Sequence, residues 1–196
     1  MKKQLVLCLR RRGYQRAMVE NITFLLPYLV LISHVVFVVL LLAIIFRNSW
    51  GRDIQIFLGK YALLLAFLIS ISTVIGSLFY SEIIGFEPCV LCWWQRVFLY
   101  PLVIIFGMAI WKKAPRAFLY AVPLTLLGAL VASYHSYVSL GGASLLPCTA
   151  VGEACSKVYV MAFGYVTLPF MGLTVALYIL LLAWADKIYK NENRNA

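Results

Sequence analysis

Residues 88–96 read Pro-Cys-Val-Leu-Cys-Trp-Trp-Gln-Arg and stand at the start of an apolar segment. This stretch places Cys89 and Cys92 in a C-x-x-C spacing, which is a redox or metal-binding signature. Arg96 follows Cys92 by four residues and would lie on the same face of a helix. Because the two cysteines border an apolar segment, we expect them at a membrane surface.

A second pair of cysteines, Cys148 and Cys155, lies in a later loop with six residues between them. For a loop pair alone, a structural disulfide is the usual reading in an oxidising compartment. Beside a C-x-x-C, an exchangeable disulfide is favoured, and the two pairs together suggest that thiol electrons pass into the bilayer. Cys8 is different, because it lies in a basic tail and has no evident partner.

The composition is that of a membrane protein. Hydrophobic residues make up 64% of the 196 residues, charged residues make up 12%, and the mean hydropathy is +0.93. The net charge of +10 does not indicate a nucleic-acid partner, because lysine and arginine cluster between apolar segments as they do in cytoplasmic loops. We therefore expect one compact membrane domain in contact with lipid.

Five apolar stretches approach the length of about 20 residues that a membrane-spanning helix needs. Helices are expected because backbone groups in lipid must be paired within their own segment. The third stretch is short, and residues 92–94 are expected to form the first turn of its helix. The predicted spans are Phe24–Phe46, Phe57–Tyr80, Val97–Trp111, Ala117–Leu140 and Tyr165–Trp184.

The predicted fold is an all-α membrane protein, a four-helix transmembrane bundle with one additional N-terminal apolar helix. Its parts are a basic tail over residues 1–23, the additional span over 24–46, the bundle over 57–184 and a cytoplasmic tail over 185–196. The chemistry of a C-x-x-C at a helix start favours a thiolate, and Cys92, as the cysteine nearer the expected helix, is the better candidate.

The basic residues predict the orientation in the membrane. Nine lie on one side if all five segments span, against eight on the other, or against two when the N-terminal tail is omitted. The second count places both cysteine pairs outside the cytoplasm. The six basic residues of the tail conflict with this unless translation begins at Met18 or Phe24–Phe46 does not span. We favour the start at Met18, because 23 apolar residues are long for a re-entrant segment.

The run from Pro88 to Pro101 resembles the DsbB/BdbC thiol oxidoreductases, whose motif is close to C-x-L-C-W-x-Q-R followed by Tyr-Pro. The later loop pair and Gly164-Tyr-Val-Thr-Leu-Pro169 also resemble that family, particularly its BdbC branch. The resemblance covers about Lys60–Trp184. The C-x-x-C precedes the loop pair, as in DsbB, whereas the vitamin K epoxide reductase relatives have the reverse order. The additional N-terminal segment departs from the family pattern.

The resemblance implies a multi-pass protein of the cell (inner) membrane that reoxidises a DsbA-like thioredoxin-fold donor and passes two electrons to a quinone, either ubiquinone or menaquinone. By the same resemblance, the donor's thiolate would attack Cys148, and Cys155 would exchange with Cys89. Cys92 would face the quinone beside Arg96.

Three further side chains have more than one interpretation. Arg96 could stabilise the Cys92 thiolate, bind a quinone carbonyl, or only extend to the lipid headgroups. His135 could help to bind the quinone headgroup, and a structural histidine at the interface is about equally plausible. His34 is expected to pack inside the bundle.

Two other classes of protein remain open at this point. The four thiolates could hold a structural zinc ion, although the guanidinium of Arg96 would be unfavourable beside a metal cation. Alternatively, both pairs could be disulfides that only stabilise a bundle. A count of reactive thiols separates these classes, because a redox relay alternates between bridged and reduced forms.

Overall fold

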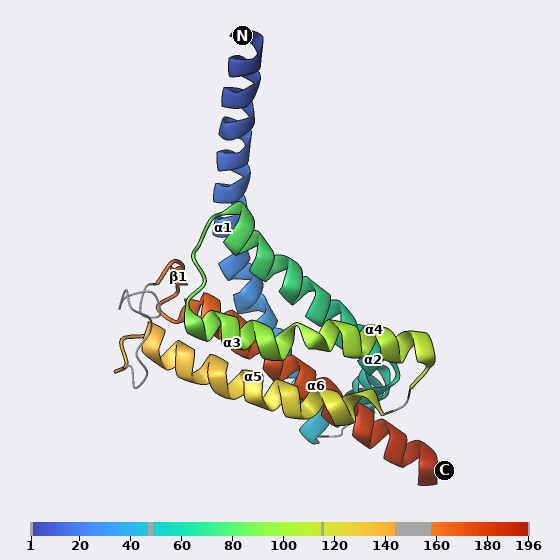
Figure 1. Ribbon diagram of the computed structural model, residues 1–196. Helices are drawn as coiled ribbons and strands as arrows, with labels where there is room; N and C mark the ends of the chain where they lie inside the picture. The colour runs from blue at the N-terminus through green and yellow to red at the C-terminus, as the bar shows by residue number, and fades with distance from the viewer. Residues whose placement is uncertain (1, 47–48, 115, 144–157, 196) are drawn as a thin grey trace.

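Helices account for nearly all of the chain in the computed structural model, which describes residues 2–46, 49–114, 116–143 and 158–195 (Figure 1). A short antiparallel pair of strands, with Met161 opposite Thr167, precedes the last helix. The elements are α1 (Lys2–Phe46), α2 (Ser49–Leu78), the π-helical turn η1 (Phe79–Ile83), α3 (Val90–Leu99), α4 (Pro101–Lys112), α5 (Ala117–Ser139), β1 (Met161–Ala162), β2 (Val166–Thr167) and α6 (Leu168–Asn195).

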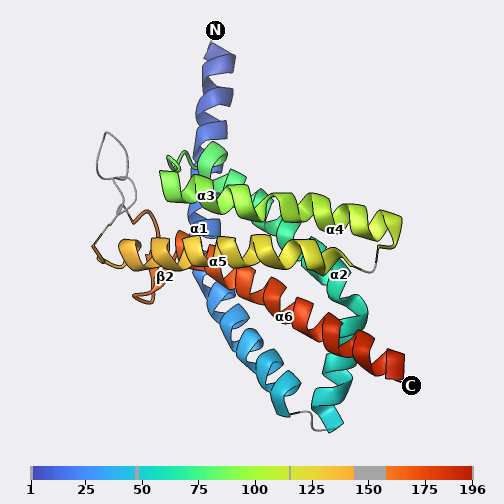
Figure 2. The same ribbon diagram turned by 60° about the horizontal axis from the view of Figure 1, so that its bottom comes forward.

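The bundle is organised around α6, which packs against α2 and α5, while α3 packs on α5 and α4 on α2 (Figure 2). Small side chains let the helix backbones approach closely where no hydrophobic driving force acts between helices. Larger side chains, among them Leu102, Phe106 and Ile179, fill the space between them and are fully buried. The alanines with no exposed surface are Ala62, Ala66, Ala121, Ala132, Ala176 and Ala185.

Five helices of the described chain are long and apolar enough to cross a membrane, as the sequence predicted. The second and fifth spans are longer than expected, and the third begins at Val90 rather than Val97. The third span changes helix at Tyr100, because Pro101 has no N–H to donate and begins α4 instead. The spans are Phe24–Phe46, Trp50–Ile83, Val90–Lys112, Ala117–Ser139 and Leu168–Arg194.

Helix α1 continues through Pro27 and includes the region predicted as a basic tail, so that its first half projects from the bundle (Figure 1). Its second half packs on α2 and α6. His34 lies at the α6 contact, where its Nε2 is 2.9 Å from Oγ1 of Thr174. His34 is only partly buried, so it lies at the interface of α1 and α6 and not inside the bundle as predicted.

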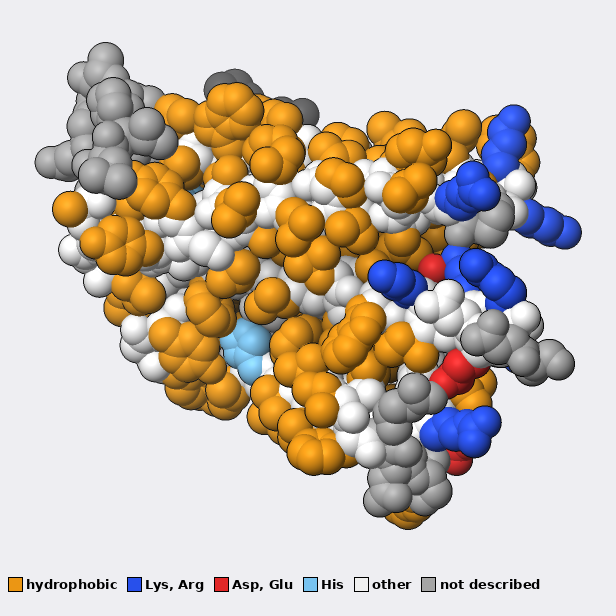
Figure 3. Space-filling model, turned by 90° about the horizontal axis from the view of Figure 1, so that it is seen from below, with side chains coloured by type: hydrophobic (Ala, Val, Ile, Leu, Met, Phe, Trp, Pro, Cys, Tyr) orange, Lys and Arg blue, Asp and Glu red, His pale blue; other side chains and the backbone are white. Residues whose placement is uncertain are grey.

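Charged side chains gather at one end of the face shown in Figure 3, and the rest of that face is mostly apolar. At this end α4 turns into α5 and α6 terminates, whereas α3 begins at the opposite end (Figure 1). The basic residues Lys112, Lys113 and Arg116 flank that turn. The C-x-x-C and these basic residues therefore lie at opposite ends of the bundle, and the sides of the membrane that they face stay a prediction.

Candidate functional site

The two cysteines of the C-x-x-C sit at the first turn of α3. Cys89 is the N-cap residue, with extended backbone angles, and its sulfur accepts a hydrogen bond from the backbone N–H of Cys92 at 3.3 Å. The two sulfurs are 3.2 Å apart, which is longer than the S–S bond of about 2.05 Å, so they are not bonded to each other. The prediction that Cys92 is nearer the helix start is wrong, because Cys89 itself caps the helix, which begins at Val90, two residues before the expected first turn.

Burial and hydrogen bonding distinguish the two thiols. Cys89 is 4% exposed, whereas Cys92 is partly exposed. The hydrogen bond with the Cys92 thiol, together with burial, raises the pKa of Cys89 to about 12, although the contact with His135 opposes this shift. Cys89 is therefore a neutral thiol at physiological pH, which leaves Cys92 as the better candidate for a nucleophilic thiolate.

His135 packs behind Cys89. This histidine of α5 is 3% exposed, its Nε2 lies 3.5 Å from the Cys89 sulfur, and its Nδ1 lies 3.3 Å from Nε2 of Gln95. The contacts link α3 to α5 across the bundle. The structure thus brings His135 to the buried cysteine. His135 is not among the described residues that line the pocket beside Cys92.

A pocket of about 610 Å³ opens beside Cys92 between α1, α2, α3 and α6. Volumes of this order are typical of small-molecule sites, which are mostly apolar with a few placed polar groups. Here the polar groups include Gln95, Arg96 and Ser77, and the apolar side chains include Leu68 and Val175. The pocket therefore suits a flat, lipophilic molecule with a polar head.

Arg96 is held in the pocket wall by α2. Its Nε donates to Oγ of Ser77 at 3.1 Å and its Nη2 donates to the Ser77 carbonyl oxygen at 3.2 Å. The guanidinium also lies over the Trp93 ring, 5.1 Å from the centroid. Within the described part of the chain Nη1 has no hydrogen-bond partner, so it can donate to a bound ligand.

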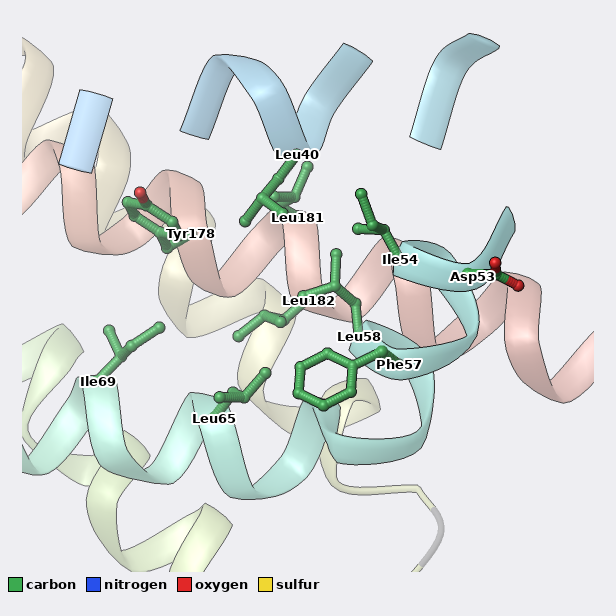
Figure 4. A pocket seen from close by; sticks show the side chains of 10 residues that line it. All are labelled: Leu40, Asp53, Ile54, Phe57, Leu58, Leu65, Ile69, Tyr178, Leu181 and Leu182. Atoms are coloured by element: carbon green, nitrogen blue, oxygen red, sulfur yellow. The ribbon is translucent and has the colours of Figure 1, made fainter. Parts of the chain in front are cut away.

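A second pocket, of about 550 Å³, lies among α1, α2 and α6 on the other side of Ile69 and Tyr178 (Figure 4). Apart from Asp53 and the Tyr178 hydroxyl, its described lining is aliphatic or aromatic. It contains neither a cysteine nor an arginine among those residues. The pocket beside Cys92 is therefore the candidate site for redox chemistry.

The structure brings together Cys89, Cys92, Arg96 and His135, whereas Cys148 and Cys155 lie outside the described residues. Sequence reasoning did not assign a role to Gln95, although it stands inside the quoted motif beside Arg96. The ligand atoms of Cys89, Cys92 and His135 all lie within 4.8 Å of one another. Such a set of two sulfurs and one imidazole could also hold a zinc ion.

We expect Cys92 to be alkylated by iodoacetamide at pH 8 about 10 times faster or more than Cys89, because only the thiolate reacts and the pKa of Cys89 is raised. The measurement is tandem mass spectrometry of reduced protein that retains only these two cysteines. Since its pKa is raised, Cys89 should become reactive only as the pH approaches 12.

The control for this prediction is His135→Gln. This change removes the contact that opposes the raised pKa, so alkylation of Cys89 at pH 8 should become slower still. Equal alkylation rates of Cys89 and Cys92 in the protein that retains His135 would contradict the distinction between the two thiols.

Comparison with known proteins places this site in context. The family model of "Disulfide bond formation protein DsbB" matches residues 59–185, which include Cys89, Cys92, Arg96 and His135. No solved structure matches the chain significantly.

Curated relatives give the same result. The "Probable disulfide formation protein C" of Bacillus cereus (strain ATCC 14579) is 43% identical over 119 residues, which cover 58% of this chain and 83% of the relative. The "Disulfide bond formation protein C" of Bacillus subtilis (strain 168) is 34% identical over 129 residues, or 65% of this chain and 93% of the relative. The "Probable disulfide formation protein" of Metapseudomonas resinovorans is 38% identical over 122 residues, or 61% and 85%.

Proposed function

We propose an electron path for this chain. The chain belongs to the DsbB family of disulfide bond formation proteins and is therefore a membrane thiol–disulfide oxidoreductase. Electrons enter from a soluble DsbA-like thioredoxin-fold protein and leave to a membrane quinone. The observation that carries the proposal is that Cys92 and Arg96 line one largely apolar pocket within the bundle.

The residues of the pocket fit a quinone. A quinone has a flat ring with two carbonyl acceptors and an isoprenoid tail, and the pocket offers a guanidinium donor together with apolar walls. Arg96 would hold a carbonyl oxygen, and side chains such as Leu68 and Val175 would contact apolar parts of the molecule. When bound there, the quinone supplies an acceptor for the two electrons and two protons that the Cys89 and Cys92 thiols lose on forming a disulfide.

The chain itself prepares the two thiols for this reaction. Closing the disulfide requires the sulfurs to approach from 3.2 Å to about 2.05 Å, a small movement at the first turn of α3. Gln95 Nε2 donates to Nδ1 of His135, which places the proton of the neutral imidazole on Nε2. That N–H lies 3.5 Å from the Cys89 sulfur and would stabilise the thiolate that forms when the Cys89 proton leaves. A direct contact between His135 and the quinone headgroup is less well supported by this geometry.

The donor side of the path involves the loop pair. Tyr159 donates a hydrogen bond to the Glu87 carbonyl oxygen at 3.3 Å, and its ring stacks on Phe86. Tyr159 follows Cys155 by four residues, which can span at most about 14 Å, and Glu87 precedes Cys89 by two. Because Cys155 and Cys89 are each only a few residues in sequence from this contact, the contact supports exchange between them, with Cys148 as the sulfur that the donor attacks.

The proposed setting is the cell membrane, with both cysteine pairs on the extracytoplasmic side and residues 185–196 in the cytoplasm. The basic residues at the α4–α5 turn, at the opposite end of the bundle from the start of α3, support this orientation (Figures 1 and 3). An oxidising exterior is also where disulfides formed by this relay would persist. The start at Met18 stays a prediction.

The test of the proposed function is reconstitution of the purified chain with a reduced DsbA-like protein and a quinone. We expect one quinone to be reduced for every two donor thiols oxidised, because forming one disulfide releases two electrons. The control is a variant with both Cys89 and Cys92 changed to alanine, which should reduce no quinone. Donor oxidation without quinone consumption would contradict the proposal.

A zinc-binding function is the second candidate, because Cys89, Cys92 and His135 place three ligand atoms together. A metal site would protect its thiols from alkylation until a chelator is added. A relay would instead lose its reactive thiols when quinone is added and regain them with reduced donor. Thiol counts under these two treatments distinguish the candidates.

A further inference from the structure

Helix α1 supplies part of the wall of the pocket beside Cys92. Its contribution comes from Leu26, Val30 and Ser33, whose spacing of four and three residues places them on one helix face. All three precede residue 59, where the match to the DsbB family begins. This wall is therefore an addition of this chain to the part that matches the family.

Polar contacts beside the pocket fix α1 against α6 and against Tyr165, which precedes α6. Nε2 of His34 lies 2.9 Å from Oγ1 of Thr174, and Nδ1 lies 3.4 Å from the Tyr165 hydroxyl. The Tyr178 hydroxyl donates a hydrogen bond to the carbonyl oxygen of Ser33. Because lipid offers no alternative partners for these groups, their pairing opposes sliding or separation of α1. The face with Val30 is thus held toward the pocket.

The two faces of α1 differ in exposure. Leu26 and Val30 are partly buried, whereas the adjacent Leu25 and Leu29 are 57% and 55% exposed. The exposed side chains lie on the surface that a membrane would cover with lipid. Leu26 and Val30 therefore belong to the pocket wall, whereas Leu25 and Leu29 belong to the outer surface of the same helix.

We propose that α1 closes the quinone pocket against lipid, and that the side chain at position 30 limits which prenylated quinones it accepts. The inference rests on the proposed function, since it identifies a wall of the same site. A larger residue at position 30 would occupy pocket volume, because the contacts of His34 and Ser33 prevent α1 from moving away. The Cys92 and Arg96 side of the site would be unaffected.

The test compares Val30→Trp with Leu29→Trp, which adds the same side chain to the exposed face. The probe is ubiquinone with two isoprene units, and its binding to protein in lipid nanodiscs is measured by calorimetry. Val30→Trp should raise the Kd about tenfold or more, whereas Leu29→Trp should stay within about twofold of the unsubstituted protein. Exchange with the reduced DsbA-like donor reports whether each variant is folded.

A second measurement uses the unsubstituted protein and an azido-benzoquinone that carries the same tail. After illumination, peptide mass spectrometry should find adducts at residues 26, 30 or 33, and not at residues 25 or 29. Label confined to α2, α3 and α6, or equal binding by both tryptophan variants, would overturn the role of α1. If the unsubstituted protein neither binds nor reduces the quinone, the proposed function fails as well, which is a distinguishable result.

Discussion

Replacing Cys92 with serine should abolish electron transfer to quinone while one round of exchange with the soluble donor survives. A hydroxyl cannot form the disulfide with Cys89, so we expect quinone reduction to fall by about 1,000-fold or more, to background. In the proposed relay, a bridge between Cys148 and Cys155 would accept the first pair of electrons without Cys92. Donor oxidation in a single turnover and quinone reduction at steady state are measured separately.

Cys148→Ser should give the opposite result, with no capture of the donor and with Cys89 and Cys92 still oxidised by quinone. Cys8→Ser is the matched control, because Cys8 has no assigned partner and its loss should change neither half-reaction. If Cys92→Ser and Cys148→Ser lose both half-reactions equally while remaining folded, the division of roles between the two pairs is wrong.

Arg96→Met should lower quinone reduction by about 10- to 100-fold, which corresponds to the loss of a hydrogen bond from a charged donor in a buried site. Both disulfides should still form, because no thiol is removed. The loss should appear mainly in the KM for quinone if Arg96 binds the ground state, and in kcat if it acts only in the transition state. Steady-state kinetics over a range of quinone concentrations separate these effects.

Arg96 also connects α3 to α2, so its removal could act through structure alone. Ser77→Ala removes the side-chain acceptor of this connection but leaves the guanidinium in the pocket. We expect this control to change quinone reduction by less than about threefold, because the carbonyl acceptor remains. A loss as large in Ser77→Ala as in Arg96→Met would assign the arginine a structural role only.

The spans could be predicted from the sequence because hydrophobic length alone determines them. The start of α3 could not be predicted, because its N-cap is the Cys89 sulfur, which accepts the Cys92 N–H. Cysteine is not one of the residues that usually cap a helix. The strand pair at residues 161–167 is too short for a periodic pattern. The fixed position of α1 depends on contacts with α6, which no local pattern reveals.

The candidate site was predictable where the residues are close in the sequence. Cys89, Cys92 and Arg96 lie within eight residues, and about two helical turns define their relation. His135 is 46 residues from Cys89, so its contact required the packing of α5 on α3. Gln95 could have been found by asking which motif residue faces that histidine. Ser33 and Val30 gave no signal beyond a polar residue in an apolar helix.

The contact between His34 and Thr174 also bears on biogenesis, because it joins residues 140 positions apart in the chain. Helix α1 is synthesised before α6, and α2 to α5 lie between them in the chain. Domains form such long-range contacts only after the intervening chain is available, so α1 cannot take its final place until α6 has entered the membrane. A nascent or truncated chain would hold the C-x-x-C with one side still open to lipid. The pocket is therefore completed only after residues 168–178 of α6 have been synthesised and inserted.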